Sequence, residues 1–421
     1  MDPSSTTGRG RTDGTAGDAD PRLIRRESGV AGHLAEFRRR MRGGELGSVP
    51  VVLGLIVIWI TFQLLDSNFL SPRNLSNLSV DIVGMGMIAI GIVFMLLIGD
   101  IDLSVGSVSG LVAAVFAVLN VNHGMTEWAA VVVAVLCGTA TGAVHGFFVA
   151  RIGAPAFVVT LAGLLGWNGL MIYLLGTAGT INLDDEGMVA RLTNEYLTSD
   201  VATYAVAAVG VAAFFLVSYR EARRRAEAGV PYRPLVEIAV RTAVLAVLAF
   251  GAAAVLVDFQ GLPLALMIFL LFVIGLDLVL RRTPYGRKVF ALGGGVEAAR
   301  RAGINVVVVR ISVFMVSGTM AAIGGLFLAS RLTSVSQALG AGELLMNVIA
   351  AAVIGGTSLF GGRGTTWSAL LGVLVIESIA SGMTLLGIEV AVQFMITGCV
   401  LLAAVVIDSL SRRLQKAHGR A

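Results

Sequence analysis

The chain is dominated by apolar runs that each have the length of a membrane span. Of its 421 residues, 56% are hydrophobic and 14% are charged, whereas soluble domains carry about 25% charged residues. Apolar runs of roughly 17 to 25 residues predict helices that cross a bilayer. The sequence therefore predicts an all-α polytopic integral membrane protein with about twelve transmembrane helices, within a range of roughly ten to twelve. The runs lie near residues 49–66, 82–99, 103–121, 126–149, 156–177, 201–218, 242–257, 264–280, 311–330, 343–359, 366–386 and 390–408.

Lysine and arginine sort to one side of these spans. If the N-terminus is cytoplasmic, all of the 31 Lys and Arg residues fall on the cytoplasmic side except Arg73, Arg191 and Arg331. Short cytoplasmic loops of membrane proteins carry such an excess of positive charge. The sequence therefore predicts that both termini are cytoplasmic.

The two ends of the chain differ from the membrane domain in composition. Residues 1–48 are polar and Arg-rich, with runs such as MDPSSTTGRG that cannot build a core. They also lack the apolar segment of a cleavable signal peptide. We expect a disordered basic cytoplasmic tail at 1–48, a membrane domain at 49–410 and a short cytoplasmic tail at 411–421.

Residues 281–310 form a polar interruption between two apolar runs. The glycines at 293–295 allow a tight turn into a helix over 296–302, and Gly303 supplies the left-handed residue that usually ends a helix. An isolated helix of this length is marginal in water, because nucleation is costly. This favours a surface on which a partner docks over a loop that merely connects two spans.

The charges of this short helix agree with its predicted direction. Glu297 lies near the positive end of the helix dipole, and Arg300 and Arg301 lie near the negative end. Glu297 and Arg301 are also four residues apart in the order that stabilises helices.

Two polar stretches near the starts of predicted spans are candidates for a transport path. In GDIDLSVGS at 99–107, Asp102 and Ser104 are placed to cap the following helix, or to contact a substrate, since charges at membrane depth are costly and often functional. In PAFVVTLAG at 155–163, Thr160 lies on roughly the same helix face as Asn168. Thr160 either bonds back to its own helix or contacts a substrate.

A third polar stretch, GGTSLFGGRGT at 355–365, is rich in glycine and contains Thr357 and Ser358. It loosely echoes 99–107, and matching breaks in two halves of a transporter point to a central site. Among isolated polar residues, Glu377 is the one least explained by packing.

Several other residues have predicted structural roles. His145 and Gln393 are expected to form interhelical hydrogen bonds, and Asp277 to pair with Arg281. The fourth span is expected to pack closely through Gly138, Gly142 and Gly146, and the ninth through Ser317, Ala321 and Gly325, because small residues let helices approach each other in lipid.

The residues needed for catalysis are scarce. The two lysines, Lys288 and Lys416, are not followed by Ser or Thr, so the chain has no P-loop. The four histidines have no metal-ligand spacing, and Cys137 and Cys399 both lie in apolar spans. The absence of an acid–base pair or metal cluster argues against a membrane enzyme, and the sorting of charge by membrane side argues against nucleic-acid binding.

Five of these stretches together resemble the permease subunits of bacterial sugar ABC importers of the ribose, xylose and galactoside type. The resemblance covers roughly 69–410, with the motifs in the same order. The additional basic region near 219–260 looks like that of the xylose-type permeases. Asp100 and Gly295 depart from the family pattern. The motifs are FLSPRNLSNL at 69–78, GDIDLSVGS at 99–107, PAFVVTLAG at 155–163, TPYGRKVFALGGGVEAARRAGIN at 283–305 and GGTSLFGGRGT at 355–365.

The resemblance implies a transporter subunit, not an enzyme, in a bacterial plasma membrane. It implies a homodimer, a separate two-domain ATPase that binds ATP and Mg²⁺, and an extracytoplasmic sugar-binding protein, with no cofactor on this chain. Residues 281–310 would be the coupling loop, and the transport path would include Asp102, Ser104, Thr160, Asn168, Thr357, Ser358 and Glu377. The ATPase would contact Gly286, Arg287, Glu297, Ala299, Arg300 and Gly303.

An alternative is a secondary sugar transporter of the major facilitator type. Such proteins have about twelve spans and a basic motif similar to RRTPYGRK at 281–288. They repeat a related motif between their second and third spans, where this chain has GDIDLSVGS without an arginine. The sequence therefore favours the ABC permease.

Overall fold

The computed structural model describes residues 49–340, 342–399, 402–403 and 406. This part of the chain is helical, as the apolar runs predict, with four short strands. The tails predicted at 1–48 and 411–421 lie outside the described residues, and the last predicted span, 390–408, is described only in part.

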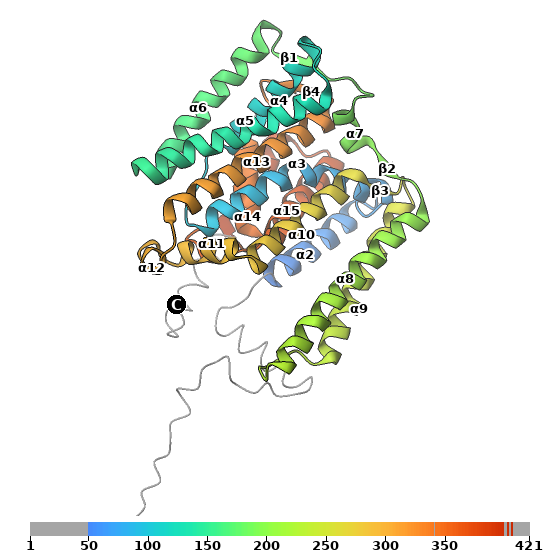
Figure 1. The fold of residues 1–421 in the computed structure, drawn as a ribbon. Helices are drawn as coiled ribbons and strands as arrows, with labels where there is room; N and C mark the ends of the chain where they lie inside the picture. Colours follow the sequence, from blue (N-terminus) through green and yellow to red (C-terminus); the bar gives the residue numbers. More distant parts are fainter. Residues whose placement is uncertain (1–48, 341, 400–401, 404–405, 407–421) are drawn as a thin grey trace, which may run out of the picture.

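The helices follow one another with short connections, and two pairs of strands join the loops (Figure 1). In chain order the elements are α2 (Val49–Leu65), α3 (Pro72–Leu97), α4 (Val105–Ala117), α5 (Glu127–Phe147), α6 (Ala156–Leu175), β1 (Thr180–Asn182), α7 (Met188–Asn194), β2 (Tyr196–Leu197), α8 (Asp200–Glu227), α9 (Leu235–Val257), β3 (Leu262–Pro263), α10 (Leu264–Arg282), α11 (Pro284–Gly294), α12 (Val296–Arg301), α13 (Val306–Leu332), β4 (Ser334–Ser336), α14 (Gly342–Ile354) and α15 (Thr366–Leu385).

Every predicted span contains one apolar helix. Nine of the helices in the described part are long and apolar enough to cross a membrane, and α2, α14 and Val390–Cys399 are shorter. Helix α14 has 13 residues, which gives a length of about 20 Å, whereas the hydrocarbon core of a bilayer is about 30 Å thick. Helix α14 alone is therefore too short to cross.

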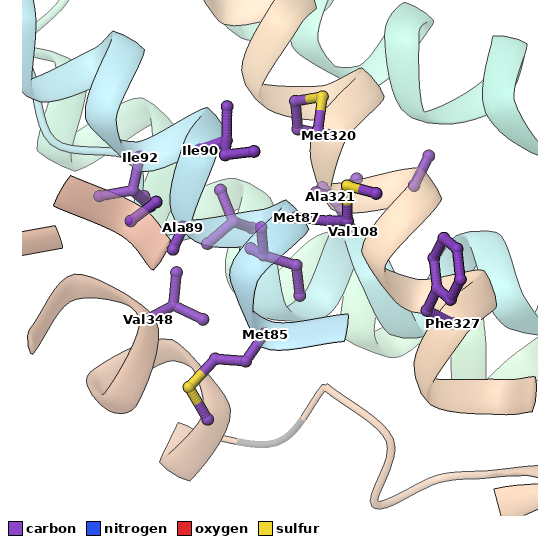
Figure 2. Close-up of a cluster of buried hydrophobic side chains, with 14 of the residues drawn as sticks. Met85, Met87, Ala89, Ile90, Ile92, Val108, Met320, Ala321, Phe327 and Val348 are labelled. Carbon is purple, nitrogen blue, oxygen red and sulfur yellow. The ribbon is translucent and has the colours of Figure 1, made fainter. Parts of the chain in front are cut away.

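Helix α3 is the most enclosed of the long helices. Every residue from Ile82 to Leu97 is buried, and Figure 2 shows its side chains among those of α4, α13 and α14. Small residues bring α13 close: a Cβ on Gly91 would lie 3.1 Å from the Cα of Ser317. Close backbone approach of this kind is how helices associate in lipid, where a hydrophobic force between them is missing.

Helix α5 packs on another side of α13 through the predicted ridge of small residues. A Cβ on Gly138, Gly142 or Gly146 would meet the backbone of α13. The second predicted ridge is also confirmed as a packing surface, because Ser317 lies against α3 and Gly325 lies against the α4 backbone.

Two breaks in the helical bundle meet each other. Residues 98–104 lead into α4 without helical structure, and the turn at 337–340 precedes α14. A Cβ on Gly106 would lie 2.7 Å from the carbonyl oxygen of Gly340. Gly340 has a φ of 80°, a conformation that favours glycine. Figure 1 shows α4 near the β1–β4 end of the bundle and α14 nearer to α11. Both helices therefore start inside the bundle and run toward opposite ends.

Short strands and a peripheral hairpin complete the fold. β1 pairs antiparallel with β4, with Ile181 opposite Val335, and β2 pairs with β3, with Leu197 opposite Leu262. In Figure 1 the β1–β4 pair lies at the end of the bundle opposite α11 and α12, and the α8–α9 hairpin lies at its edge. Most of this hairpin is exposed in the isolated chain, as expected of helices that face lipid.

Candidate functional site

Segments far apart in the sequence meet at the end of α11. The amide of Gly362 donates to the carbonyl of Leu97, the last residue of α3, at 2.9 Å. Gly293, in the last turn of α11, lies so close to that carbonyl that a Cβ would collide with it. Gly361 lies against both Gly293 and Gly99. These four glycines, 99, 293, 361 and 362, are called the glycine junction below.

An ion pair fixes the chain next to the glycine junction. The Nε of Arg310 lies 2.7 Å from Oδ2 of Asp100, and its second nitrogen lies 3.0 Å from Oδ1. The two side chains are 24% and 10% exposed, and a two-bond pair of this kind sets orientation as well as distance. It joins the start of the 98–104 break to the second turn of α13, which follows α12 after a short loop.

Asp102 is the centre of a buried polar network. Its Oδ1 accepts from the amide of Ser104 at 2.9 Å and from the Ser104 hydroxyl at 2.6 Å, and its Oδ2 accepts from the Ser317 hydroxyl at 3.1 Å. The Ser104 side chain does not cap α4, so this part of the predicted cap is wrong, whereas Asp102 accepts from the amide of the residue that directly precedes the helix. Asp102 instead forms a local turn with Ser104 and connects it to α13.

His145 extends this network to α5 and α6. The indole nitrogen of Trp167 donates to Nε2 of His145 at 2.9 Å, so the ring proton belongs on Nδ1, which lies 3.3 Å from the Ser104 hydroxyl. The predicted interhelical bond of His145 is thus confirmed. The carboxylate of Asp102 accepts from Ser104 and not from the histidine, which is not the arrangement of a nucleophilic triad. The network holds helices together.

The polar interruption at 281–310 contains two short helices. Helix α11 was not predicted, although Thr283 followed by Pro284 is a typical helix start, and the Thr283 hydroxyl accepts from the Gly286 amide at 3.3 Å. Gly293 and Gly294 belong to this helix, and Gly295 alone precedes α12. Gly303 has the predicted positive φ, at 77°.

Helix α12 turns one apolar face inward and its charges outward. Ala299 is buried, whereas Glu297, Arg300 and Arg301 are exposed. The spacing of four predicted that Glu297 pairs with Arg301. Glu297 instead pairs with Arg300 at 3.0 Å, because residues three apart are also neighbours on a helix.

Helix α11 is anchored to α13 through Tyr285. The Ser312 hydroxyl donates to the oxygen of Tyr285 at 3.1 Å. Burial raises the pKa of Tyr285, and the bond from Ser312 partly offsets this effect. The phenol therefore stays protonated, and the contact is unchanged across the physiological pH range.

Comparison with known families decides the class of the protein. Residues 74–405 match the family described as permease component of the branched-chain amino acid transport system. The chain belongs to this family. It is therefore a multi-pass membrane protein. No solved structure matches it significantly.

The permease is similar to several transport proteins of bacteria. It is 35% identical over 86% of its length to the xylose transport system permease protein XylH of Escherichia coli strain K12, of which it covers 90%. It is 34% identical to XylH of Haemophilus influenzae, of which it covers 96%. The ribose import permease protein RbsC of Bacillus subtilis is 30% identical, and the permease covers 96% of it. All three are named as permeases, not as enzymes.

The residues predicted to line a path are spread over the permease. The Thr160 hydroxyl donates to the carbonyl of Ala156 at 2.9 Å, so it bonds back to its own helix, and it also lies 3.4 Å from the carbonyl of Ile101. Asn168 is half-buried two turns further along α6. Among the predicted path residues, Asp102 and Ser104 are joined by two hydrogen bonds.

The other predicted path residues lie toward the C-terminus. The hydroxyl of Thr357 is buried without a hydrogen-bond partner among the described residues. Ser358 accepts from the amide of Phe360 at 3.2 Å and shapes the turn next to the glycine junction. Glu377 is half-buried in α15.

The set predicted to contact an ATPase divides into buried and exposed residues. Gly286 and Ala299 are buried and support α11 and α12, whereas Arg287, Glu297, Arg300 and Gly303 are exposed.

Of the remaining predicted contacts, Asp277 pairs with Arg281 at 2.9 Å, as expected. Among the described residues, Gln393 bonds not to another helix but to the carbonyl of Ile388, close by in the chain.

Proposed function

We propose that this chain is the transmembrane permease subunit of an ATP-driven ABC importer for a monosaccharide, xylose or a related pentose. The observation that carries the proposal is the likeness to xylose permeases along 86% of the chain. Relatives named for ribose and arabinose transport also match along most of the chain, which supports a pentose as the substrate class.

In this proposal the α11–α12 end of the bundle lies in the cytoplasm of a bacterial cell. A separate two-domain ATPase binds the exposed charges of α12 and Arg287, and ATP and Mg²⁺ reside on that partner. A sugar-binding protein delivers the substrate to the opposite end, and two copies of the chain form the transporter. The contacts at the glycine junction and the Asp100–Arg310 pair support this assignment, because they connect α11 and α13 rigidly to the helices that would surround the path.

Exchanging the charges of α12 tests the coupling role. In a transporter co-expressed with its ATPase and binding protein, Glu297→Arg combined with Arg300→Glu keeps the local pair but reverses both charges presented to a partner. We expect at least about a tenfold loss of labelled xylose uptake and of ATPase co-purification, since like charges placed against each other at an interface cost several kcal/mol and each 1.4 kcal/mol is about tenfold.

The matched control is the exchange Arg223→Glu with Glu227→Arg. This exposed pair in α8 has the same kind of geometry, at 2.9 Å, and lies on the peripheral hairpin. Its exchange should leave uptake unchanged. Full uptake and co-purification in the α12 exchange would contradict the coupling role.

The energy source distinguishes an ABC importer from a secondary transporter. In proteoliposomes that contain all three components, import should require ATP and continue after the proton gradient is collapsed. Import that stops with the gradient and continues without ATP would favour the secondary transporter.

A further inference from the structure

Polar side chains of α3 and α15 face each other along one side of the bundle. The Ser381 hydroxyl of α15 lies 3.0 Å from the side-chain oxygen of Asn74 in α3. Asn77 and Asp81 continue this stripe on α3 in successive turns, and Glu377 lies one turn before Ser381 on α15. Because the two helices run in opposite directions, Glu377 lies level with the deeper part of the α3 stripe. Its carboxyl group is close enough to interact electrostatically with Asp81 and Glu343.

Arg331 crosses to this stripe from the end of α13. Its Nε donates to Oδ1 of Asp81 at 2.8 Å, and a second nitrogen lies 3.4 Å from the side-chain oxygen of Asn77. The side chains of Arg331 and Asp81 are 34% and 38% exposed. Oδ2 of Asp81 accepts no hydrogen bond from the described residues, so it is available to a ligand.

The exposure of Asp81 contrasts with the rest of α3. All the residues that follow it, from Ile82 to Leu97, are buried. Met85, one turn deeper than Asp81, is 6% exposed, and Figure 2 shows it with Val348 of α14 in the apolar cluster around α3. The polar stripe is therefore open at the β1–β4 end and is closed by apolar side chains one turn further in.

Stability does not account for these charges. A half-exposed ion pair contributes little to folding, and charged groups within a membrane bundle are costly and usually mark the path of a substrate. Arg331 presents several hydrogen-bond donors, and Asp81, Asn77 and Glu377 present acceptors. A ligand with many neutral hydroxyl groups, which both donate and accept, matches this set.

We propose that Asn77, Asp81, Arg331 and Glu377 form a hydroxyl-binding site for the sugar at the outer mouth of the path, above the apolar layer at Met85. The inference rests on the proposed function and adds the residues that meet the sugar first. In this site Oδ2 of Asp81 and the carboxyl group of Glu377 form hydrogen bonds with sugar hydroxyls, while the Arg331 guanidinium donates to a neighbouring sugar oxygen.

The test compares variants of the complete transporter in proteoliposomes. Asp81→Asn and Glu377→Gln keep side-chain shape, and Asp81→Arg with Arg331→Asp exchanges the ion pair. The control exchanges Arg223 and Glu227, an exposed pair on the peripheral hairpin whose charged atoms lie 2.9 Å apart. Initial uptake rates are measured for xylose and arabinose, which differ in the orientation of one hydroxyl, together with yield and ATPase co-purification.

We expect each variant of the site to lower xylose uptake at least tenfold and to change the xylose-to-arabinose ratio at least threefold, with yield and co-purification retained. The control should change neither rate nor ratio. The ratio is decisive, because a purely structural defect lowers both rates alike.

Three results would overturn the inference. One is an exchanged pair that transports both sugars at the wild-type ratio, because the pair would then be structural. Another is wild-type uptake in both Asp81→Asn and Glu377→Gln. A third is a loss of uptake that added inorganic cations reverse, because the carboxylates would then bind a cation. If the unsubstituted transporter moves no sugar at all, the proposed function itself fails, and this outcome is separate from the other three.

Discussion

Replacing Gly293 by alanine is expected to disrupt the glycine junction. The added Cβ would collide with the Leu97 carbonyl, which already accepts from Gly362 at 2.9 Å. Either α11 moves away or this hydrogen bond breaks, and overpacking of this kind costs about 1–3 kcal/mol or more. We expect a lower melting temperature of the purified protein in detergent and a reduced rate of uptake, because α11 would no longer be held against α3.

The neighbouring glycine provides the control. A Cβ on Gly294 meets nothing within 4 Å, and alanine is favoured over glycine within helices by up to about 1 kcal/mol. Gly294→Ala should therefore leave melting and uptake unchanged or slightly improved. Equal melting temperatures for the two variants would show that α11 is not held tightly against α3.

Replacing Asp102 by alanine is expected to have the largest effect on folding. The change leaves the amide and hydroxyl of Ser104 and the hydroxyl of Ser317 without the acceptor they share. Each unsatisfied buried group costs about 1–3 kcal/mol. We therefore expect a loss of roughly 3–5 kcal/mol, seen as a strongly reduced yield of monodisperse protein.

Two milder variants separate the charge of Asp102 from its hydrogen bonds. Asp102→Asn keeps one acceptor oxygen for Ser104, and Ser317→Ala removes a single donor. Yield and melting temperature should fall in the order Ser317→Ala, Asp102→Asn, Asp102→Ala, with the last the most damaged. A tolerated Asp102→Ala would mean that water replaces the carboxylate and that the site is open to solvent.

The sequence predicts the helices well because the thickness of a bilayer fixes how long an apolar run must be. It also predicts contacts that follow from helical spacing, such as the Asp277–Arg281 pair and the glycine ridge of α5. This ridge can be predicted because a spacing of four places Gly138, Gly142 and Gly146 on one face of the helix, whichever helix packs against it.

The sequence does not predict which distant residues meet. Arg310 and Asp100 are 210 positions apart, and Asp102 and Ser317 are 215 positions apart. No local rule relates the members of either pair. Arg331 is one of three positive charges that the sequence predicts on the outer side, and only the fold brings it to Asp81. The roles predicted for Thr160, Asn168, Thr357 and Ser358 in transport stay predictions.

The meeting of Gly106 and Gly340 bears on how the protein is made. Helix α14 is too short to cross a bilayer. The segment before it must therefore reach into the bundle, where Gly340 packs against the start of α4. Such a segment is a poor substrate for insertion on its own, because its non-helical backbone is tolerated at this depth only when other protein surrounds it. We therefore expect α14 to enter the membrane only after α4 and its neighbours have assembled there.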